Sequence, residues 1–253
     1  MSVRPVYIIA GVGNGTGTGA ATAIQSRASR AQRRSLSNTA KDIVAAGGEV
    51  AAFPVKEYNY SAVLDVFNTI KQHKWSSSQE PAEIRGAVWN AGAGVFKNFL
   101  DVSEEELQQS IDANITAAFA FSRGAILAFR ENPIDNLGKR GTIIFTGATA
   151  SIRGNVLTSA FAAGKFALRA LSQSLAKEFG KENIHVAHAI IDGGILTDRS
   201  AERRTGDARE EFKTNQDIRL SPESIAQSYL YLANQDRSAW TWELDLRPAH
   251  EKW

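Results

Sequence analysis

Five glycines near the N-terminus have the spacing of a turn that binds phosphate. They follow the apolar run at residues 6–9 and precede small residues that favour a helix. They are Gly11, Gly13, Gly15, Gly17 and Gly19. Glycines let the backbone approach a ligand closely, and the N-terminus of the following helix offers free N–H groups to an anion. The Gly11-x-x-x-Gly15-x-Gly17 spacing between strand and helix therefore favours a nucleotide site over a plain surface turn.

Three further groups of polar and small residues follow apolar runs. They are Asn90-Ala91-Gly92, residues 146–151 and residues 192–197. In an open parallel sheet, ligands bind beyond the carboxyl ends of the strands. If the apolar runs are neighbouring strands, these groups and the glycine turn lie at one edge and can form one site.

The elements that would position these groups alternate along the chain. Strand-like runs lie at residues 6–9, 49–55, 86–89, 142–145, 184–191 and 242–246. Helical spacing lies at residues 61–74, from Ser103 to about Glu131, at 161–179 and from Ser221 onward. Ser103 and Glu106 form a capping box that marks the start of the long helix. The alternation predicts the α/β class: one Rossmann-like doubly wound domain over residues 1–253, mostly parallel, with helices on both faces.

Residues 18–48 depart from this alternation. These 31 residues keep an approximately helical period and contain no β-branched run of strand length. A helix, a strand and a second helix with their connections need roughly 35–40 residues. We therefore expect the second strand to be missing or degenerate, through genuine loss or through a shortened gene product.

The composition limits the class of protein. The chain has 253 residues, is 43% hydrophobic, carries a net charge of +2 and contains no cysteine. These values exclude disulfides and thiolate metal sites and give no reason to expect a nucleic-acid partner. No apolar run approaches 18 residues and no signal pattern precedes the first strand, so we expect a cytoplasmic protein without membrane contact. His185 and His188 are three apart on a predicted strand, so we interpret them as structural and expect no metal site.

Taken together, the four turns resemble those of the short-chain dehydrogenase/reductase family, and the resemblance covers nearly the whole chain. The family has a Rossmann-type fold and uses NAD(H) or NADP(H). Asn114 matches the helix asparagine that holds a proton-relay water, and Lys165 matches the active-site lysine. Asp192-Gly193-x-x-x-Thr197 is similar to the Pro-Gly-x-x-x-Thr turn beside the nicotinamide, with Asp in place of Pro. The resemblance implies a cofactor site made of Gly11, Asn14, Gly15, Gly17, Asn90, Ala91, Gly92, Lys165, Gly193, Ile195 and Thr197.

The sequence departs from the family at the catalytic tyrosine and serine. The Tyr-x-x-x-Lys motif is here Phe161 to Lys165, and the serine position, 13 residues before Phe161, is Ala148. A phenyl ring cannot exchange a proton, and an alanine cannot hydrogen-bond a carbonyl. The nearby hydroxyls of Thr149, Thr158 and Ser159 are candidate replacements, although we interpret them mainly as turn and capping groups.

A second departure from the family concerns the part of the site that would bind the adenosine of the cofactor. The missing strand is the one that chooses NAD or NADP in the family. The cluster of Arg27, Arg30, Arg33 and Arg34 is interpreted as a solvated helix face, with contact to a 2′-phosphate as an alternative.

Three hypotheses follow for the function. The first is an NAD(P)-dependent oxidoreductase of the short-chain type that transfers hydride to or from a small carbonyl or alcohol, with an atypical proton donor. The others are a catalytically inactive binding or scaffold protein and a non-redox isomerase or lyase on the same pocket. The charged segment at about residues 197–220 corresponds to the family's substrate lid. The resemblance also implies a homodimer or homotetramer formed through the two long helices.

Overall fold

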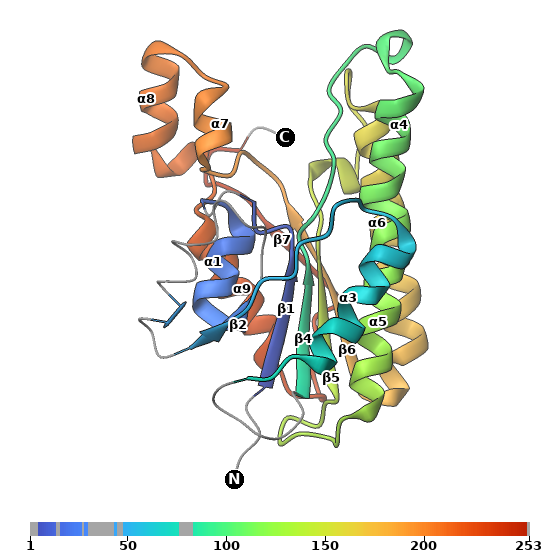
Figure 1. The fold of residues 1–253 in the computed structure, drawn as a ribbon. Helices are drawn as coiled ribbons and strands as arrows, with labels where there is room; N and C mark the ends of the chain where they lie inside the picture. The colour runs from blue at the N-terminus through green and yellow to red at the C-terminus, as the bar shows by residue number, and fades with distance from the viewer. Residues whose placement is uncertain are drawn as a thin grey trace.

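A five-stranded parallel sheet forms the centre of the molecule (Figure 1). The computed structural model describes residues 5–13, 16–26, 28–29, 43–44, 48–75 and 83–251. The strand order is β1-β4-β5-β6-β7, and every neighbouring pair is parallel. The strands are β1 (Pro5–Ala10), β4 (Glu83–Trp89), β5 (Gly141–Thr146), β6 (Ile184–Ile191) and β7 (Glu243–Leu246). Residues of β5 and β6 are buried throughout, which explains why these strands read as continuous apolar runs.

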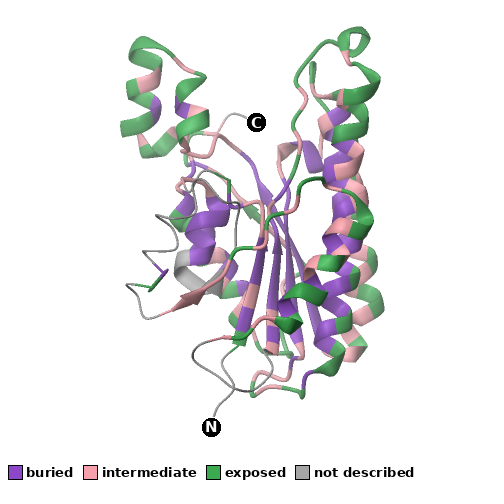
Figure 2. Cartoon of the chain, in the orientation of Figure 1, coloured by how far each residue is buried: buried purple, intermediate pink, exposed green. Residues whose placement is uncertain are grey.

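Helices cover both faces of this sheet, and the buried residues concentrate between them and the strands (Figures 1 and 2). One apolar cluster joins the sheet to α3, α5 and α6, and a second joins it to α1 and α9. The helices are α1 (Thr18–Ser26), α3 (Tyr60–Gln72), α4 (Glu104–Ile111), α5 (Ala117–Glu131), α6 (Ser159–Phe179) and α9 (Pro222–Asn234). The predicted doubly wound architecture is confirmed.

The second strand is degenerate, as the sequence predicts. A two-residue strand, β2 (Ala28–Ser29), pairs in parallel with β3 (Glu49–Val50) in a separate small sheet. The prediction was wrong in detail, because it had no strand between residues 25 and 48 and a longer one over 49–55. After Val50 the chain leaves the extended ladder, where Pro54 has no N–H to donate and Phe53 turns toward the core. The arginines of the basic cluster lie outside the described residues.

The predicted long helix begins and ends where expected but contains a change of winding. Ser103 caps α4, because its hydroxyl accepts the Glu106 N–H at 3.2 Å and the Glu106 carboxylate accepts the Ser103 N–H at 3.1 Å. Between α4 and α5 lies a π-helical turn, η2 (Asp112–Thr116), which carries Asn114. Such turns inside helices often occur at functional sites.

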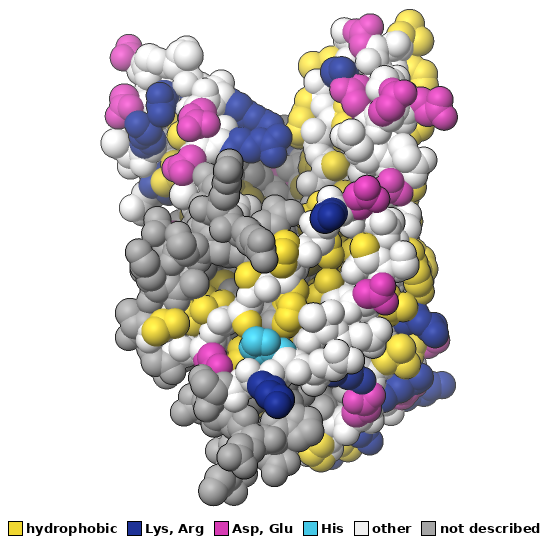
Figure 3. Space-filling model, viewed as in Figure 1, with side chains coloured by type: hydrophobic (Ala, Val, Ile, Leu, Met, Phe, Trp, Pro, Cys, Tyr) yellow, Lys and Arg dark blue, Asp and Glu magenta, His cyan; other side chains and the backbone are white. Residues whose placement is uncertain are grey.

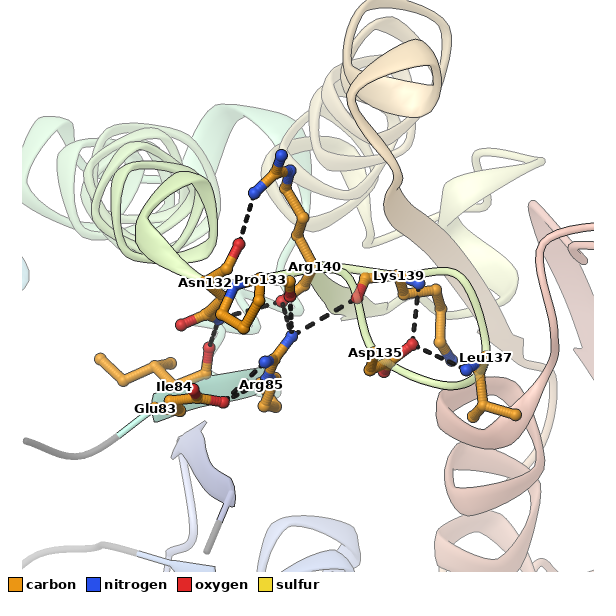
Figure 4. Close-up of polar contacts among 9 residues, drawn as sticks. All are labelled: Glu83, Ile84, Arg85, Asn132, Pro133, Asp135, Leu137, Lys139 and Arg140. Atoms are coloured by element: carbon orange, nitrogen blue, oxygen red, sulfur yellow. Dashed lines mark hydrogen bonds and ion pairs between the residues drawn. The ribbon is translucent and has the colours of Figure 1, made fainter. Parts of the chain in front are cut away.

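Polar contacts at the opposite edge of the sheet hold the loop between α5 and β5 (Figure 4). Arg85 forms an ion pair with Glu83 at 2.6 Å and donates to the Pro133 carbonyl at 2.7 Å. Asn132 donates to the carbonyls of Ile84 at 2.7 Å and Arg140 at 3.0 Å. These contacts satisfy backbone carbonyls where the strands begin, so we assign this edge a structural role.

The segment predicted as a substrate lid projects from the carboxyl edge of the sheet. It contains α7 (Asp198–Glu202), α8 (Gly206–Thr214) and a short 3-10 turn, η5 (Gln216–Ile218). This segment and the N-terminal end of α4 form two lobes with a notch between them (Figures 1 and 3). Within the described ranges, no helix is both long and apolar enough to span a membrane.

Candidate active site

The glycine turn packs tightly against the turn that follows β4. Gly11 has φ +79°, and a Cβ atom there would lie 2.5 Å from the backbone nitrogen of Ala91. Gly13 also has a positive φ, +66°, but no heavy atom of the described residues outside its chain neighbours lies within 4 Å of its missing Cβ. Gly11 therefore serves backbone packing, whereas Gly13 leaves open space at the surface of the turn. The predicted ligands Asn14 and Gly15 lie outside the described residues.

Asn90 joins these two turns through its side chain. Its amide Nδ2 donates to the Gly11 carbonyl at 2.7 Å, and its backbone N–H donates to the Ala10 carbonyl at 3.1 Å. Gly19, in the first turn of α1, allows this approach, because a Cβ there would lie 2.6 Å from the Gly11 oxygen. The predicted residues Gly11 and Asn90 are therefore part of one rigid unit.

A cavity of about 330 Å³ opens beside this unit. Both turns line it, together with apolar side chains from the segment between β3 and α3, from β4 and from α5. The lining includes Gly11, Gly13, Asn90, Ala91, Gly92, Phe53, Val55, Tyr58, Trp89, Phe121 and Arg199. Its size and its few polar groups among apolar ones are those of a small-molecule site.

Asn114 presents a buried amide oxygen beside Gly92, which lines the cavity. Its Nδ2 donates to the carbonyls of Ser110 at 3.0 Å and Ala93 at 3.1 Å, which fixes the orientation of the amide. Its Oδ1 is buried and has no hydrogen-bond partner among the described residues. A buried carbonyl oxygen without a donor is costly, so this atom is suited to accept a hydrogen bond from a bound molecule.

The side chain of Lys165, on α6, reaches the same place beside Gly92 as the Asn114 amide. Its Nζ donates to the Thr146 carbonyl at 2.9 Å, and burial lowers the pKa of its ammonium group to about 8. A Cβ on Gly92 would lie 3.1 Å from Asn114 Oδ1 and 3.3 Å from Lys165 Nζ. The absence of a side chain at Gly92 therefore leaves room where an acceptor and a cationic donor meet.

Apolar groups fill the positions of the family's tyrosine and serine. The Phe161 ring packs against Phe96, with ring centroids 5.1 Å apart, and its centroid lies 6.0 Å from Lys165 Nζ. Ala148 precedes the 3-10 turn η3 (Thr149–Ser151), which packs against α6. Ala148 thus lies next to the site, and its side chain has no hydroxyl that could form a hydrogen bond there.

The hydroxyls considered as replacements have other partners. Thr149 donates to the carboxylate of Asp192, and Thr158 donates to the Asn155 carbonyl at 2.8 Å. Ser159 is exposed at the start of α6. The turn role expected for Thr158 agrees with this geometry.

Asp192, which replaces the family's proline, is the centre of a buried ionic cluster. Its carboxylate pairs with Arg247 at 2.5 Å and with Arg153 at 3.6 Å, in addition to the Thr149 hydroxyl. The cluster ties the ends of β6 and β7 to the segment around η3. The Asp192 substitution was visible in the sequence, but its partners lie far from it along the chain.

The predicted residues after β6 connect the lid to the glycine turn. Ile195 forms a parallel bridge with Leu220, and the Thr197 hydroxyl accepts the Ser200 N–H at 3.0 Å to cap α7. A Cβ on Gly17 would lie 3.5 Å from the Thr197 methyl group. The structure therefore brings Thr197 to the glycine turn, as the resemblance implies.

The two strand histidines have structural partners, and the His188 ring lies against Gly147, between Thr146 and Ala148. His188 Nδ1 lies 3.0 Å from Glu243, which also pairs with Arg169 at 2.6 Å. His185 Nε2 contacts the Thr241 carbonyl at 2.8 Å. Burial lowers the pKa of both imidazoles to about 4, so both are neutral at neutral pH.

Comparison with known proteins identifies the family to which this geometry belongs. A family model described as short chain dehydrogenase matches residues 5–208. The chain belongs to this family. Membership confirms the resemblance and the cofactor class predicted from the sequence, a nicotinamide dinucleotide.

Individual relatives are moderately similar. A 3alpha-hydroxysteroid dehydrogenase from Mediterraneibacter gnavus is 33% identical over 158 residues, 62% of this chain and 60% of the relative. A crystal structure of a short-chain dehydrogenase from Rhodopseudomonas palustris has a TM-score of 0.73 at 29% identity, covering 96% of this chain and 98% of the other. An alcohol dehydrogenase from Thermococcus sibiricus, complexed with 5-hydroxy-NADP, has a TM-score of 0.78 at 19% identity with 99% coverage of both chains, which shows the shared fold. The alignments span 50 to 66% of the length of the first curated relatives.

Proposed function

We propose that this protein is an NAD(P)-dependent oxidoreductase that transfers hydride to or from a small carbonyl or alcohol without a tyrosine. The observation that carries the proposal is the convergence of Lys165 Nζ and Asn114 Oδ1 beside Gly92. Gly92 lines the cavity that the glycine turn lines as well. The curated relatives with about one third identity are dehydrogenases, which supports the same reaction class.

The described residues fit a dinucleotide. The open space at Gly13 suits close approach of a pyrophosphate, and the first turn of α1 provides free N–H groups toward it. The unpartnered Asn114 Oδ1 and the Lys165 ammonium group suit hydroxyl groups of the nicotinamide ribose or of bound water. The bound cofactor would supply hydride, and Gly11, Gly17, Asn90, Ala91, Gly193, Ile195 and Thr197 would shape its site.

Lys165 is the group to which we assign the proton of the reaction. Phe161 and Ala148 carry no exchangeable side-chain proton, and the Thr149 hydroxyl is engaged by Asp192. Burial holds the pKa of Lys165 near 8, so its ammonium form can release a proton near neutral pH. The substrate oxygen would take this proton, and Asn114 Oδ1, which lies close to Lys165 Nζ, would accept a hydrogen bond from the alcohol or from bound water.

This assignment predicts a pH dependence for carbonyl reduction. The donor is protonated below its pKa, so kcat/KM for reduction should be level below about pH 8 and fall about tenfold per pH unit above it. The oxidation direction needs the neutral amine and should rise over the same range. NADH and NADPH consumption with a panel of small ketones and aldehydes measures reduction. NADH and NADPH formation with the corresponding alcohols measures oxidation. A reduction rate that stays level to about pH 10 would exclude Lys165 as the donor.

A catalytically inactive binding protein is the second candidate. The apolar packing of Phe161 on Phe96 and the missing hydroxyl at Ala148 favour it. Under this alternative the cofactor still binds, but no carbonyl in the panel is reduced at a rate above the reaction without protein.

We also propose a homodimer or homotetramer through the two long helices and a cytoplasmic location. Phe119 and Leu127 on α5 and Phe166 on α6 are 51%, 42% and 42% exposed, which supports a partner surface there. Size-exclusion chromatography with light scattering tests the assembly.

A further inference from the structure

A second cavity, of about 490 Å³, lies where the lid meets the loop after β4. The loop and α4 provide most of its lining, and the lid provides one side chain. The lining residues are Gly94, Val95, Phe96, Lys97, Glu106, Gln109 and Arg203. Its volume is within the range of small-molecule sites.

A row of side chains leads from this cavity to the candidate active site. The Arg203 guanidinium carbon lies 6.0 Å from the centroid of Phe96, and Phe96 packs on Phe161 at 5.1 Å. Phe161 in turn lies 6.0 Å from Lys165 Nζ. A molecule bound against Phe96 in this cavity would therefore lie one ring away from Phe161, which contacts Lys165.

Arg203 supplies the uncompensated charge of the cavity. Lys97 pairs with Glu106 at 2.5 Å, and Glu106 also accepts the Ser103 N–H, so these two charges neutralise each other. Within the described part of the chain, the Arg203 side chain forms neither a hydrogen bond nor an ion pair, and its guanidinium lies over the Phe96 ring. Figure 3 shows basic side chains on the side of the lid lobe that faces the notch.

We propose that Arg203 and Phe96 select a substrate that carries a carboxylate on a planar apolar body, with its carbonyl directed toward Lys165. A guanidinium presents a rigid fork of donors that matches a carboxylate, and it also stacks on an aromatic face. The ring of Phe96, which is 51% exposed, offers the flat apolar surface next to it. This inference rests on the proposed oxidoreductase function and names its substrate class.

Two probes of nearly equal shape separate the effect of the ligand's charge on affinity from the effect of its shape. Calorimetric binding of 4-acetylbenzoate and of its neutral analogue 4-acetylbenzamide is measured on the full chain, with and without NADPH. We expect the wild-type protein to bind the carboxylate about two- to fivefold more tightly than the amide, because a charged pair with an exposed arginine has an effect of that size. Arg203→Leu should remove the difference, and Arg203→Lys should keep part of it, because it retains the charge and loses the fork.

Lys213→Leu is the matched control for overall charge. Lys213 also lies on the lid but pairs with Glu210 at 2.9 Å and does not line the cavity, so the variant should keep the preference. Phe96→Ala should weaken both probes alike. Equal affinity for the two probes, no binding of either, or a preference that survives Arg203→Leu would overturn the inference. NADPH binding to the same samples, followed by its fluorescence, shows separately whether the proposed oxidoreductase function fails.

Discussion

The double variant Phe161→Tyr with Ala148→Ser is expected to raise carbonyl reduction by about 10²- to 10⁴-fold. It restores a phenol that can exchange a proton and a hydroxyl that can orient the carbonyl. Both positions lie next to the site, because η3 packs against α6 and the Phe161 ring lies 6.0 Å from Lys165 Nζ. The buried ammonium of Lys165 would favour the phenolate form of the new tyrosine, which lowers the pKa of its hydroxyl. Steady-state NADH and NADPH oxidation with the ketone panel measures the gain.

Two single variants separate the contributions in this test. Phe161→Tyr alone should give most of the gain, and Ala148→Ser alone should give little, because an orienting hydroxyl without a proton donor completes no step. Cofactor affinity should stay within a few-fold in all three variants. A double variant that binds cofactor with no increase in reduction would contradict the view that this pocket retains a catalytic geometry.

The variant Lys165→Met is expected to make the protein more stable and to abolish productive cofactor binding. Lys165 is 6% exposed, and among the described residues its ammonium group donates to the Thr146 carbonyl oxygen. Since burial lowers its pKa from 10.5 to about 8, the folded state carries a destabilising charge at neutral pH. Removing the charge should raise the free energy of unfolding by about 1 to 3 kcal/mol and Tm by about 2 to 8 °C.

The size of this stability gain depends on pH. The cost of the buried ammonium is complete below about pH 8 and disappears as the pH rises toward 10.5, so the advantage of the methionine should shrink over that range. Thermal unfolding of both proteins at several pH values measures it. A lower Tm for Lys165→Met together with unchanged cofactor affinity would contradict a functional role for this lysine.

Lys139→Met is the matched control. Lys139 is 2% exposed, and its Nζ donates to the Ala233 carbonyl at 2.5 Å, at the far edge of the sheet. Burial lowers the pKa of Lys139 too, but Asp135 and Asp236 oppose the shift. Its replacement should therefore give a smaller gain in stability and leave cofactor binding unchanged.

Local signals in the sequence were enough to predict the main sheet, its helices and one edge of the site. The Ser103 capping box, the apolar runs of β5 and β6 and the spacing of the glycine turn each depend on neighbours a few residues away. For the same reason the position of Lys165 could be transferred from the family motif. These features need no knowledge of the rest of the chain.

Other features depend on contacts between distant segments and could not be predicted. The cluster around Asp192 joins it to Arg153 and Arg247, 39 and 55 residues away. Phe96 and Arg203 meet across the notch from different segments. The π-helical turn at Asn114 follows the same helical sequence pattern as its neighbours, and β3 ends at Val50 although the apolar pattern continues.

The most direct test of the central claim is a titration of the purified wild-type protein with NADPH and with NADH, followed by the fluorescence of the reduced nicotinamide. We expect saturable binding of one or both in the micromolar range, because the turns around Gly11 and Asn90 line a cavity and Lys165 lies beside it at Gly92, despite the degenerate second strand. Lys165→Met should lose this signal and Lys139→Met should keep it. No binding of either cofactor at millimolar concentration would contradict the oxidoreductase function.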